Sequence, residues 1–378
     1  MEFRDLQKQY QLHKTEIDSA IQNVLLSSHF IGGEPVKQLE EKLADYVGVK
    51  HCITCANGTD ALQLALMAWG IREGDAVFVP DFTFFSTAEV VPWVKATPVF
   101  VDVDKDTFNI SSQSLEEAIH EVIREGKLTP KVVIAVDLFG QPADFSAIRA
   151  ITEKYDMLLL EDGAQGFGGR IGEKKACSFG DIATTSFFPA KPLGCYGDGG
   201  AIFTNNDKWA YLMSSYKVHG KGENKYDNVR IGLNSRLDTL QAAILLAKFD
   251  SFVNVEIDAV NMVAIQYNEY LSDVVELPAV KKEFVSSWAQ YTIKLPNRRD
   301  ELKTYLSQNS IPSMIYYSKP LHEQLAFKKQ QRTYCCLDNT IELCGMVLSL
   351  PMHPYMENDD VEIVSSNINA FMNNISKL

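Results

Sequence analysis

The sequence predicts an α/β protein in which a large domain with a mostly parallel sheet is followed by a smaller α+β domain. Two observations support this prediction. From residue 48 to about residue 250, short apolar runs alternate with helical patterns, as in strand–helix units around a parallel sheet. Beyond that point the alternation ends, and helical patterns with few strand-like pieces follow. We therefore expect a large domain with an N-terminal helical segment over 1–250 and a small domain over 251–378.

The strand predictions depend on short runs of apolar residues. The run at 157–160 is apolar at four successive positions, which is typical of a strand covered on both faces. The predicted strands are 76–79, 98–101, 132–136, 157–160, 184–188 and 201–204 in the large domain, and 291–295 in the small one.

Helices are predicted where apolar residues recur about every 3.6 positions. Apolar residues from Leu12 to Leu25 follow that spacing and predict one helix over 11–27. Gly48 is expected to end the next helix. The other predicted helices are 34–47, 115–123, 145–155, 237–252 with a continuation after a break to 270, 299–308, 337–344 and 359–373.

Composition and charge exclude several classes of protein. The formal net charge of -13 argues against binding to nucleic acid or to an anionic membrane surface. No apolar run is long enough to span a bilayer, and the first residues lack the core of a signal peptide. We therefore expect a cytoplasmic enzyme without membrane insertion, whose substrate can still be a small anion.

The seven cysteines do not indicate a metal centre. Cys52 and Cys55 form a lone C-x-x-C, but the second pair that a zinc site requires is missing. We expect buried or incidental thiols and no metal.

Lys191 lies in the most informative stretch, where residues 186–200 read SFFPAKPLGCYGDGG. Pro192 restricts the residue before it, so Lys191 cannot lie inside a regular helix. A strand pattern precedes the lysine and a glycine-rich turn follows, which indicates a loop at a strand end, where α/β enzymes place their chemistry. The glycines lack the G-x-G-x-x-G spacing of a dinucleotide site.

Asp162 follows directly after the predicted strand at 157–160. A buried carboxylate at that place requires a cationic or hydrogen-bonding partner. Pyridoxal phosphate (PLP) requires both a lysine that forms a Schiff base and an acid beside the pyridine nitrogen. An aspartate that caps a turn explains the same position. Gln165 can bond to the ring hydroxyl of PLP, or it can be an ordinary polar loop residue.

A phosphate site is indicated by Gly58 and Thr59, which precede the helical pattern ALQLALM. The start of a helix binds phosphate through free N–H groups, and a small residue permits close approach. A helix cap accounts for the same threonine. Ser186 can add a hydroxyl to the phosphate. Phe84 can stack on the cofactor ring, although packing in a core is the ordinary role of a phenylalanine.

These motifs resemble those of the DegT/DnrJ/StrS nucleotide-sugar aminotransferases, which are PLP enzymes of fold type I. The likeness runs nearly end to end, from FIGGEPV at 30–36 and NGTDAL at 57–62 to LSLPMHPY at 348–355. The most specific string, at 186–205, is most similar to the WbpE-type branch. That branch aminates C3 of a UDP-linked 2-acetamido-3-keto-hexuronic acid during synthesis of surface polysaccharide, such as lipopolysaccharide O-antigen.

The resemblance implies a role for each candidate residue. It implies Lys191 as the Schiff-base lysine, Asp162 as the partner of the pyridine nitrogen, Gln165 near the ring oxygen, Phe84 stacked on the ring, and Gly58, Thr59 and Ser186 at the phosphate.

It also implies a homodimer with shared active sites, in which Asn234 reaches the phosphate and Arg236 the sugar carboxylate of the neighbouring subunit. A surface ion pair is the alternative for Arg236. Tyr316 and Tyr317, followed by Ser318, stand where the branch usually has His-Tyr-Pro near the sugar. This departure bears on the identity of the sugar.

The implied reaction transfers an amino group from L-glutamate to a nucleotide-linked keto sugar in two half-reactions. One alternative is an aminotransferase for a 4-keto or 3-keto-6-deoxy sugar on dTDP, UDP or GDP. Another is a PLP sugar dehydratase, which the presence of Lys191 disfavours because such members carry histidine there. The third is a binding protein without catalysis.

Overall fold

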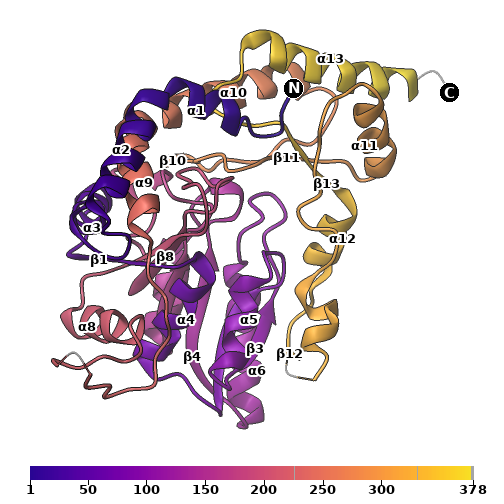
Figure 1. Cartoon of the computed structure of the whole chain (residues 1–378). Helices are drawn as coiled ribbons and strands as arrows, with labels where there is room; N and C mark the ends of the chain where they lie inside the picture. The colour runs from indigo at the N-terminus through magenta and orange to yellow at the C-terminus, as the bar shows by residue number, and fades with distance from the viewer. Residues whose placement is uncertain (225, 330, 376–378) are drawn as a thin grey trace.

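The computed structural model describes residues 1–224, 226–329 and 331–375 (Figure 1). Its large domain contains an eight-stranded sheet. All neighbouring strands are parallel except at β9, which runs antiparallel to both β1 and β8. The strand order is β1 (His51–Cys55), β9 (Gly200–Thr204), β8 (Ile182–Ser186), β5 (Leu158–Asp162), β4 (Thr129–Val136), β2 (Asp75–Pro80), β3 (Thr97–Val101) and β12 (Arg332–Thr333). The predicted fold class is confirmed.

Helices cover both faces of this sheet. Val77 and Val79 of β2 pack under one group of helices and Ala76 and Phe78 under the other, because successive strand side chains point to opposite faces. The first group is α4 (Gly58–Trp69), α5 (Ser86–Trp93) and α8 (Asp207–Tyr216). The second is α3 (Glu34–Val47), α6 (Ser112–Glu125), α7 (Phe145–Lys154) and α9 (Thr239–Ser251).

A second hydrophobic core lies in the C-terminal part of the chain. It is formed by α10 (Ile257–Leu271), α11 (Arg299–Gln308), α13 (Asn358–Ile375), β11 (Tyr291–Lys294) and β13 (Val347–Leu350), at the top of Figure 1. However, α12 (Asp338–Met346) packs on the large domain, and β12 extends the large sheet. The division of the chain at residue 250 therefore stays a prediction.

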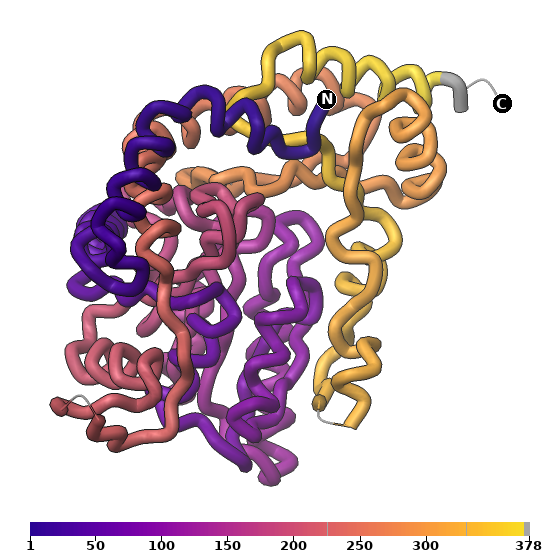
Figure 2. The backbone as a smooth tube through the Cα atoms, in the orientation of Figure 1, coloured from indigo at the N-terminus to yellow at the C-terminus, as the bar shows by residue number. Residues whose placement is uncertain are grey.

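The N-terminal helical segment differs from its prediction. The expected single helix is divided into α1 (Leu6–Leu12) and α2 (Lys14–Ser27), because His13 has non-helical backbone angles. The residues that precede α1 reach the small domain. There the carbonyl oxygen of Phe3 accepts a hydrogen bond of 3.2 Å from the N–H of Met352. Figure 2 shows this indigo segment beside the yellow C-terminal part of the chain.

Among the differences from the strand predictions, two bear on candidate residues, at β8 and β1. β8 ends at Ser186, two residues before the expected end, because the carbonyl of Phe188 already accepts a hydrogen bond from Lys191 in a turn. β1 was not predicted. It places Cys52 and Cys55 in the cores on opposite faces of the sheet, so these two thiols cannot bind the same metal ion.

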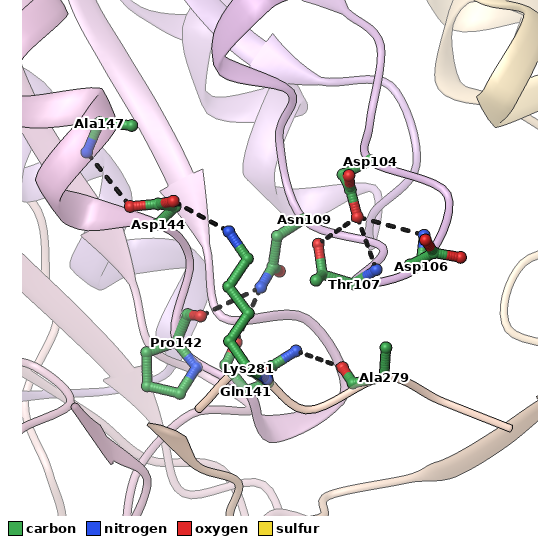
Figure 3. Close-up of polar contacts among 10 residues, drawn as sticks. All are labelled: Asp104, Asp106, Thr107, Asn109, Gln141, Pro142, Asp144, Ala147, Ala279 and Lys281. Atoms are coloured by element: carbon green, nitrogen blue, oxygen red, sulfur yellow. Dashed lines mark hydrogen bonds and ion pairs between the residues drawn. The ribbon is translucent and has the colours of Figure 1, made fainter. Parts of the chain in front are cut away.

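The segment before β11 connects the two domains (Figure 3). Lys281 donates from its backbone N–H to Gln141 Oε1 at 2.9 Å and from Nζ to Asp144 at 2.9 Å. Asn109 bonds to the carbonyl of Gln141 at 3.0 Å and accepts from the N–H of Leu138 at 2.9 Å. This network fixes η1 (Leu138–Gly140), at the end of β4. The short strands β6 (Arg170–Ile171), β7 (Lys174–Lys175) and β10 (Phe284–Val285) form a separate sheet beside it.

Candidate active site

A cavity of about 480 Å³ lies at the carboxyl ends of β4, β5 and β8 and at the start of α4. This edge of a parallel sheet is where α/β proteins bind their ligands. Nine of the predicted site residues line the cavity: Gly58, Thr59, Phe84, Asp162, Gln165, Ser186, Lys191, Tyr316 and Tyr317. Asn234 and Arg236 do not line it.

Asp162 is the last residue of β5 and is 5% exposed. Its Oδ2 accepts a hydrogen bond of 2.8 Å from the hydroxyl of Thr87, and its Oδ1 accepts one of 3.2 Å from the N–H of Ala164. Burial raises the pKa of this carboxyl, whereas the two hydrogen bonds and the charge of Lys191 lower it. Thr87 was not identified from the sequence, because it lies 75 residues away in the chain.

Lys191 lies in the loop between β8 and β9, and its side chain faces the same cavity. Burial lowers the pKa of the lysine amine to about 8, while Asp162 acts in the opposite direction and Arg4 adds to the lowering. A much larger fraction of this amine is therefore neutral near pH 7 than of an ordinary lysine. A neutral amine is what nucleophilic attack and proton transfer require.

The start of α4 has the features of a phosphate site. Asn57 caps the helix by accepting a hydrogen bond of 2.7 Å from the N–H of Asp60, and Gly58 follows the cap. A Cβ on Gly58 would lie 2.8 Å from Cβ of Ser186, so only glycine permits this close approach. The Thr59 hydroxyl lies 2.7 Å from the hydroxyl of Ser86, which was not predicted. Free N–H groups and hydroxyls here suit a dianionic phosphate.

Gln165 and Phe84 both line the cavity but differ in burial. Gln165 is 4% exposed; its Oε1 accepts a hydrogen bond of 2.7 Å from the N–H of Phe139, and its Nε2 donates to the Tyr317 hydroxyl at 3.2 Å. Phe84 is 54% exposed, so it is not a core residue. Its ring centroid lies 6.4 Å from that of Tyr317, and its exposed face is available to a flat ligand.

Asn234 and Arg236 lie in the segment that precedes α9. Asn234 is exposed and Arg236 is half-buried. Among the residues that the structure describes, none forms a hydrogen bond or ion pair with the guanidinium of Arg236. The alternative of an ion pair within the subunit therefore has no support in the described residues.

The residues present fit PLP. A carboxylate and a part-buried amine line one cavity, and a helix start with a glycine forms another part of its wall. Within the described ranges, no three His, Cys, Asp or Glu side chains are grouped closely enough to hold a metal ion. None of the helices described is both long and apolar enough to cross a membrane.

Known proteins resemble the chain over nearly its full length. Residues 11–369 match the DegT/DnrJ/EryC1/StrS aminotransferase family. A UDP-2-acetamido-2-deoxy-3-oxo-D-glucuronate aminotransferase of Pseudomonas aeruginosa is 44% identical over 96% of this chain and 98% of that protein. A pleiotropic regulatory protein of Geobacillus stearothermophilus is 39% identical over 97% of each.

A solved structure also resembles the chain over nearly its full length. The crystal structure of a DegT DnrJ EryC1 StrS aminotransferase from Brucella abortus has a TM-score of 0.96 and 48% identity, and the match covers 98% of this chain and 99% of that one. Fold, cavity and similarity agree, and the chain belongs to the DegT/DnrJ/EryC1/StrS family as a PLP-dependent aminotransferase.

Proposed function

We propose that the enzyme transfers the amino group of L-glutamate to C3 of a UDP-linked 2-acetamido-3-keto-hexuronic acid, for synthesis of a surface polysaccharide such as O-antigen. The observation that carries the proposal is the pairing of Lys191 and Asp162 in one cavity beside the start of α4. The 44% identity with the glucuronate aminotransferase supports this sugar. The proposed location is the cytoplasm, where such an enzyme meets both nucleotide sugar and amino acid.

Each residue has a defined task in this proposal. Bound PLP supplies a conjugated, electron-poor ring that stabilises negative charge on the carbon beside the reacting nitrogen. Lys191 would hold the cofactor as a Schiff base. Once free, its amine would accept the proton from the α-carbon of L-glutamate and deliver it to the cofactor carbon C4′ in the same half-reaction; in the second half-reaction it would move a proton from C4′ to the sugar carbon. Asp162 keeps the pyridine nitrogen protonated, and Gln165 binds the ring oxygen.

The phosphate and ring contacts complete the proposal. The helix start at Gly58 and Thr59, with the hydroxyl of Ser186, binds the phosphate. Phe84 covers one face of the ring. These contacts fix the orientation of the cofactor while Lys191 moves protons.

We further propose that the active sites are shared between two subunits of a homodimer. Asn234 and Arg236 lie outside their own cavity, and exposed apolar side chains occur nearby in the chain: Ile231 is 92% exposed and Val229 is 52% exposed. A second subunit that covers these side chains would remove them from water. Arg236 of that subunit then binds the sugar carboxylate through its planar fork.

The first experiment is an absorbance spectrum of the purified protein, followed by addition of L-glutamate. The proposal expects a visible band from PLP bound to Lys191, and conversion of that band to the pyridoxamine form. The variant Lys191→Ala should lack both. Near-parental turnover in this variant would refute the assignment of the lysine.

A panel of keto sugars then identifies the acceptor. It contains the UDP-3-keto-hexuronic acid, its counterpart without the carboxylate, and 4-keto-6-deoxy and 3-keto-6-deoxy sugars on dTDP, UDP and GDP. Formation of the 3-amino uronic acid with the highest kcat/KM supports the proposal. Release of water without a new amine would indicate a dehydratase, and binding without turnover would indicate a regulatory protein.

Co-expression of two variants tests the shared site. Lys191→Ala should be inactive, and Arg236→Glu should keep only a small fraction of the parental rate at uronic acid concentrations well below KM. Under that condition a mixture should regain about a quarter of the parental activity, because half of randomly paired dimers are mixed and each contains one complete site. If Arg236 acts in its own subunit, no mixed dimer has a complete site and activity does not return.

A further inference from the structure

Beneath the loop that contains Lys191, two cationic side chains bind backbone carbonyl groups of that loop. The Nη2 atom of Arg4 donates to the carbonyl oxygen of Lys191 at 2.9 Å and to that of Pro192 at 3.3 Å. Lys248, which is 1% exposed, donates from Nζ to the carbonyl oxygen of Gly194 and to Gln9 Oε1 at 3.0 Å. Three carbonyl groups within four residues are therefore bound by cations.

Glu256 is the acid of this cluster. It is 4% exposed, its Oε1 accepts a hydrogen bond of 2.6 Å from the hydroxyl of Tyr355, and His13 Nε2 lies 3.6 Å from it. Burial lowers the pKa of both Arg4 and Lys248, that of Lys248 to about 8, and the charge of Glu256 opposes this lowering in each. One carboxylate thus stabilises two cations beneath the loop.

Arg4 reaches the loop because the start of the chain is fixed on the small domain (Figure 2). The carbonyl oxygen of Phe3 accepts a hydrogen bond from the N–H of Met352, as described above. The ring centroid of Phe3 also lies 6.3 Å from that of Tyr316, which lines the cavity. Residues far apart in the chain therefore meet at the wall of the site, next to Arg4 in the sequence.

We propose that Arg4 is a positioning residue for Lys191, because its guanidinium fixes the loop through the two successive carbonyl groups of Lys191 and Pro192. The proposal rests on the assigned role of Lys191 in transamination. A guanidinium suits this task because it remains charged and presents several donors in a fixed plane.

The charges around the Lys191 amine give the direction of the expected effect. Burial and the charge of Arg4 lower its pKa, and Asp162 raises it. Loss of the Arg4 charge should therefore raise the pKa of the amine. A loosened loop would admit water, which favours the charged form of the amine and would also raise its pKa.

The test compares two substitutions of Arg4 with a matched control. Arg4→Gln removes the charge but keeps a donor for the carbonyls, and Arg4→Lys keeps the charge but loses the planar fork. The control is Arg149→Gln. Arg149 is also part-buried, and it donates to Asp181 at 2.9 Å and to the carbonyl of Phe179 at 2.9 Å. These two residues precede the first residue of β8, whereas the loop of Lys191 follows its last residue.

The pKa of Lys191 is measured in the full chain freed of cofactor, by competitive labelling with acetic anhydride at increasing pH and mass spectrometry. In Arg4→Gln it should rise by about one unit, at the low end of the effect of a close charge. It should rise by less than half as much in Arg4→Lys and stay unchanged in the control. No rise in Arg4→Gln, equal rises in both Arg4 variants, or an equal rise in the control would overturn the proposal.

Amide hydrogen exchange in the cofactor-loaded protein tests the loop itself. The N–H groups of 187–195 should exchange at least about threefold faster in Arg4→Gln than in the parent, since less free energy is needed to open the loop. Exchange rates in Arg4→Gln equal to those of the parent would contradict the positioning role of Arg4. Neither measurement involves turnover, so a failure of this proposal is distinct from a failure of the proposed transamination, which the L-glutamate experiment on the parent detects.

Discussion

The floor and the mouth of the cavity are built in different ways. The floor consists of Asp162 at a strand end and Thr87 on α5, both almost fully buried and bonded to each other. The mouth contains Phe84 and Phe188, which are 54% and 51% exposed, and Arg236 lies outside it. The rigid floor can serve one chemistry for any keto sugar, whereas recognition of the sugar depends on exposed loops and, in our proposal, on a second subunit.

The largest expected effect concerns the floor. Asp162→Asn has nearly the same shape but cannot keep the pyridine nitrogen protonated. We expect kcat to fall about 10²- to 10³-fold, the usual loss when one preorganised electrostatic group is removed. Because Asp162 acts on the cofactor in our proposal, the fall should be the same for every sugar of the panel. A fall confined to the uronic acid would show that Asp162 recognises the sugar instead.

The positions of Asp162 in the floor and of Lys191 in the same cavity were predictable from sequence, and the reason is local. Asp162 ends β5 and Lys191 follows β8, so that chain direction alone places them at one edge of the sheet. Thr87 and Arg4 were missed because they reach the site through contacts over 75 and 187 residues, which no local pattern records. Lys248 was missed because a lysine within an apolar helix gives no sign that it binds a distant carbonyl.

The mouth was less predictable. Arg236 was assigned a role only through resemblance to a family, and the single subunit leaves this residue outside the cavity. The Tyr316–Tyr317 pair does line the cavity, although the family pattern differs there. The panel of keto sugars tests which sugar this mouth accepts.

The second prediction concerns the mouth. Arg236→Lys keeps the charge and loses the planar fork, and Arg236→Glu reverses the charge. For Arg236→Glu we expect kcat/KM with the uronic acid to fall about 10- to 100-fold, the value of a hydrogen bond to a charged group. The loss should appear mainly in KM, and the sugar without the carboxylate should be unaffected. Equal losses with both sugars would place Arg236 at the cofactor rather than at the sugar.

The third prediction returns to the floor, with a smaller change. Thr87→Val removes the hydroxyl that donates to Asp162 and keeps the shape of the side chain. That hydrogen bond lowers the pKa of Asp162, so its loss should raise this pKa and move the acidic limb of the pH–rate profile to higher pH. We expect kcat to fall about tenfold near neutral pH. Thr83→Val is the matched control, because Thr83 bonds to the hydroxyl of Thr87 and is not bonded to Asp162. A similar shift in both variants would contradict the role of the Thr87 hydroxyl.

The smallest expected effect concerns the contact between Asp81 and His322. This contact attaches the segment that follows Tyr316 and Tyr317, at the mouth of the cavity, to the large domain. Asp81, which follows β2, accepts hydrogen bonds from the backbone N–H of His322 at 2.7 Å and from its ring Nδ1 at 2.5 Å. The carboxylate raises the pKa of His322. Since the folded-state pKa is above the unfolded one, the stabilisation is fully present below the ordinary histidine pKa and is lost as pH rises through the raised value.

Urea unfolding of the parent and of His322→Asn tests this expectation. The variant should be less stable by about 1 kcal/mol at about pH 5.5, a value reduced for partial exposure to solvent, and the difference should shrink at about pH 8.5. His120→Asn, at an exposed histidine beside Tyr155, is the control and should show no such trend. A difference that does not depend on pH would mean that His322 stabilises this segment by packing alone.

Since Asp81 and His322 do not line the cavity, kcat of His322→Asn should stay near the parental value. This result would show that the mouth can be weakened without any change in the chemistry of the floor.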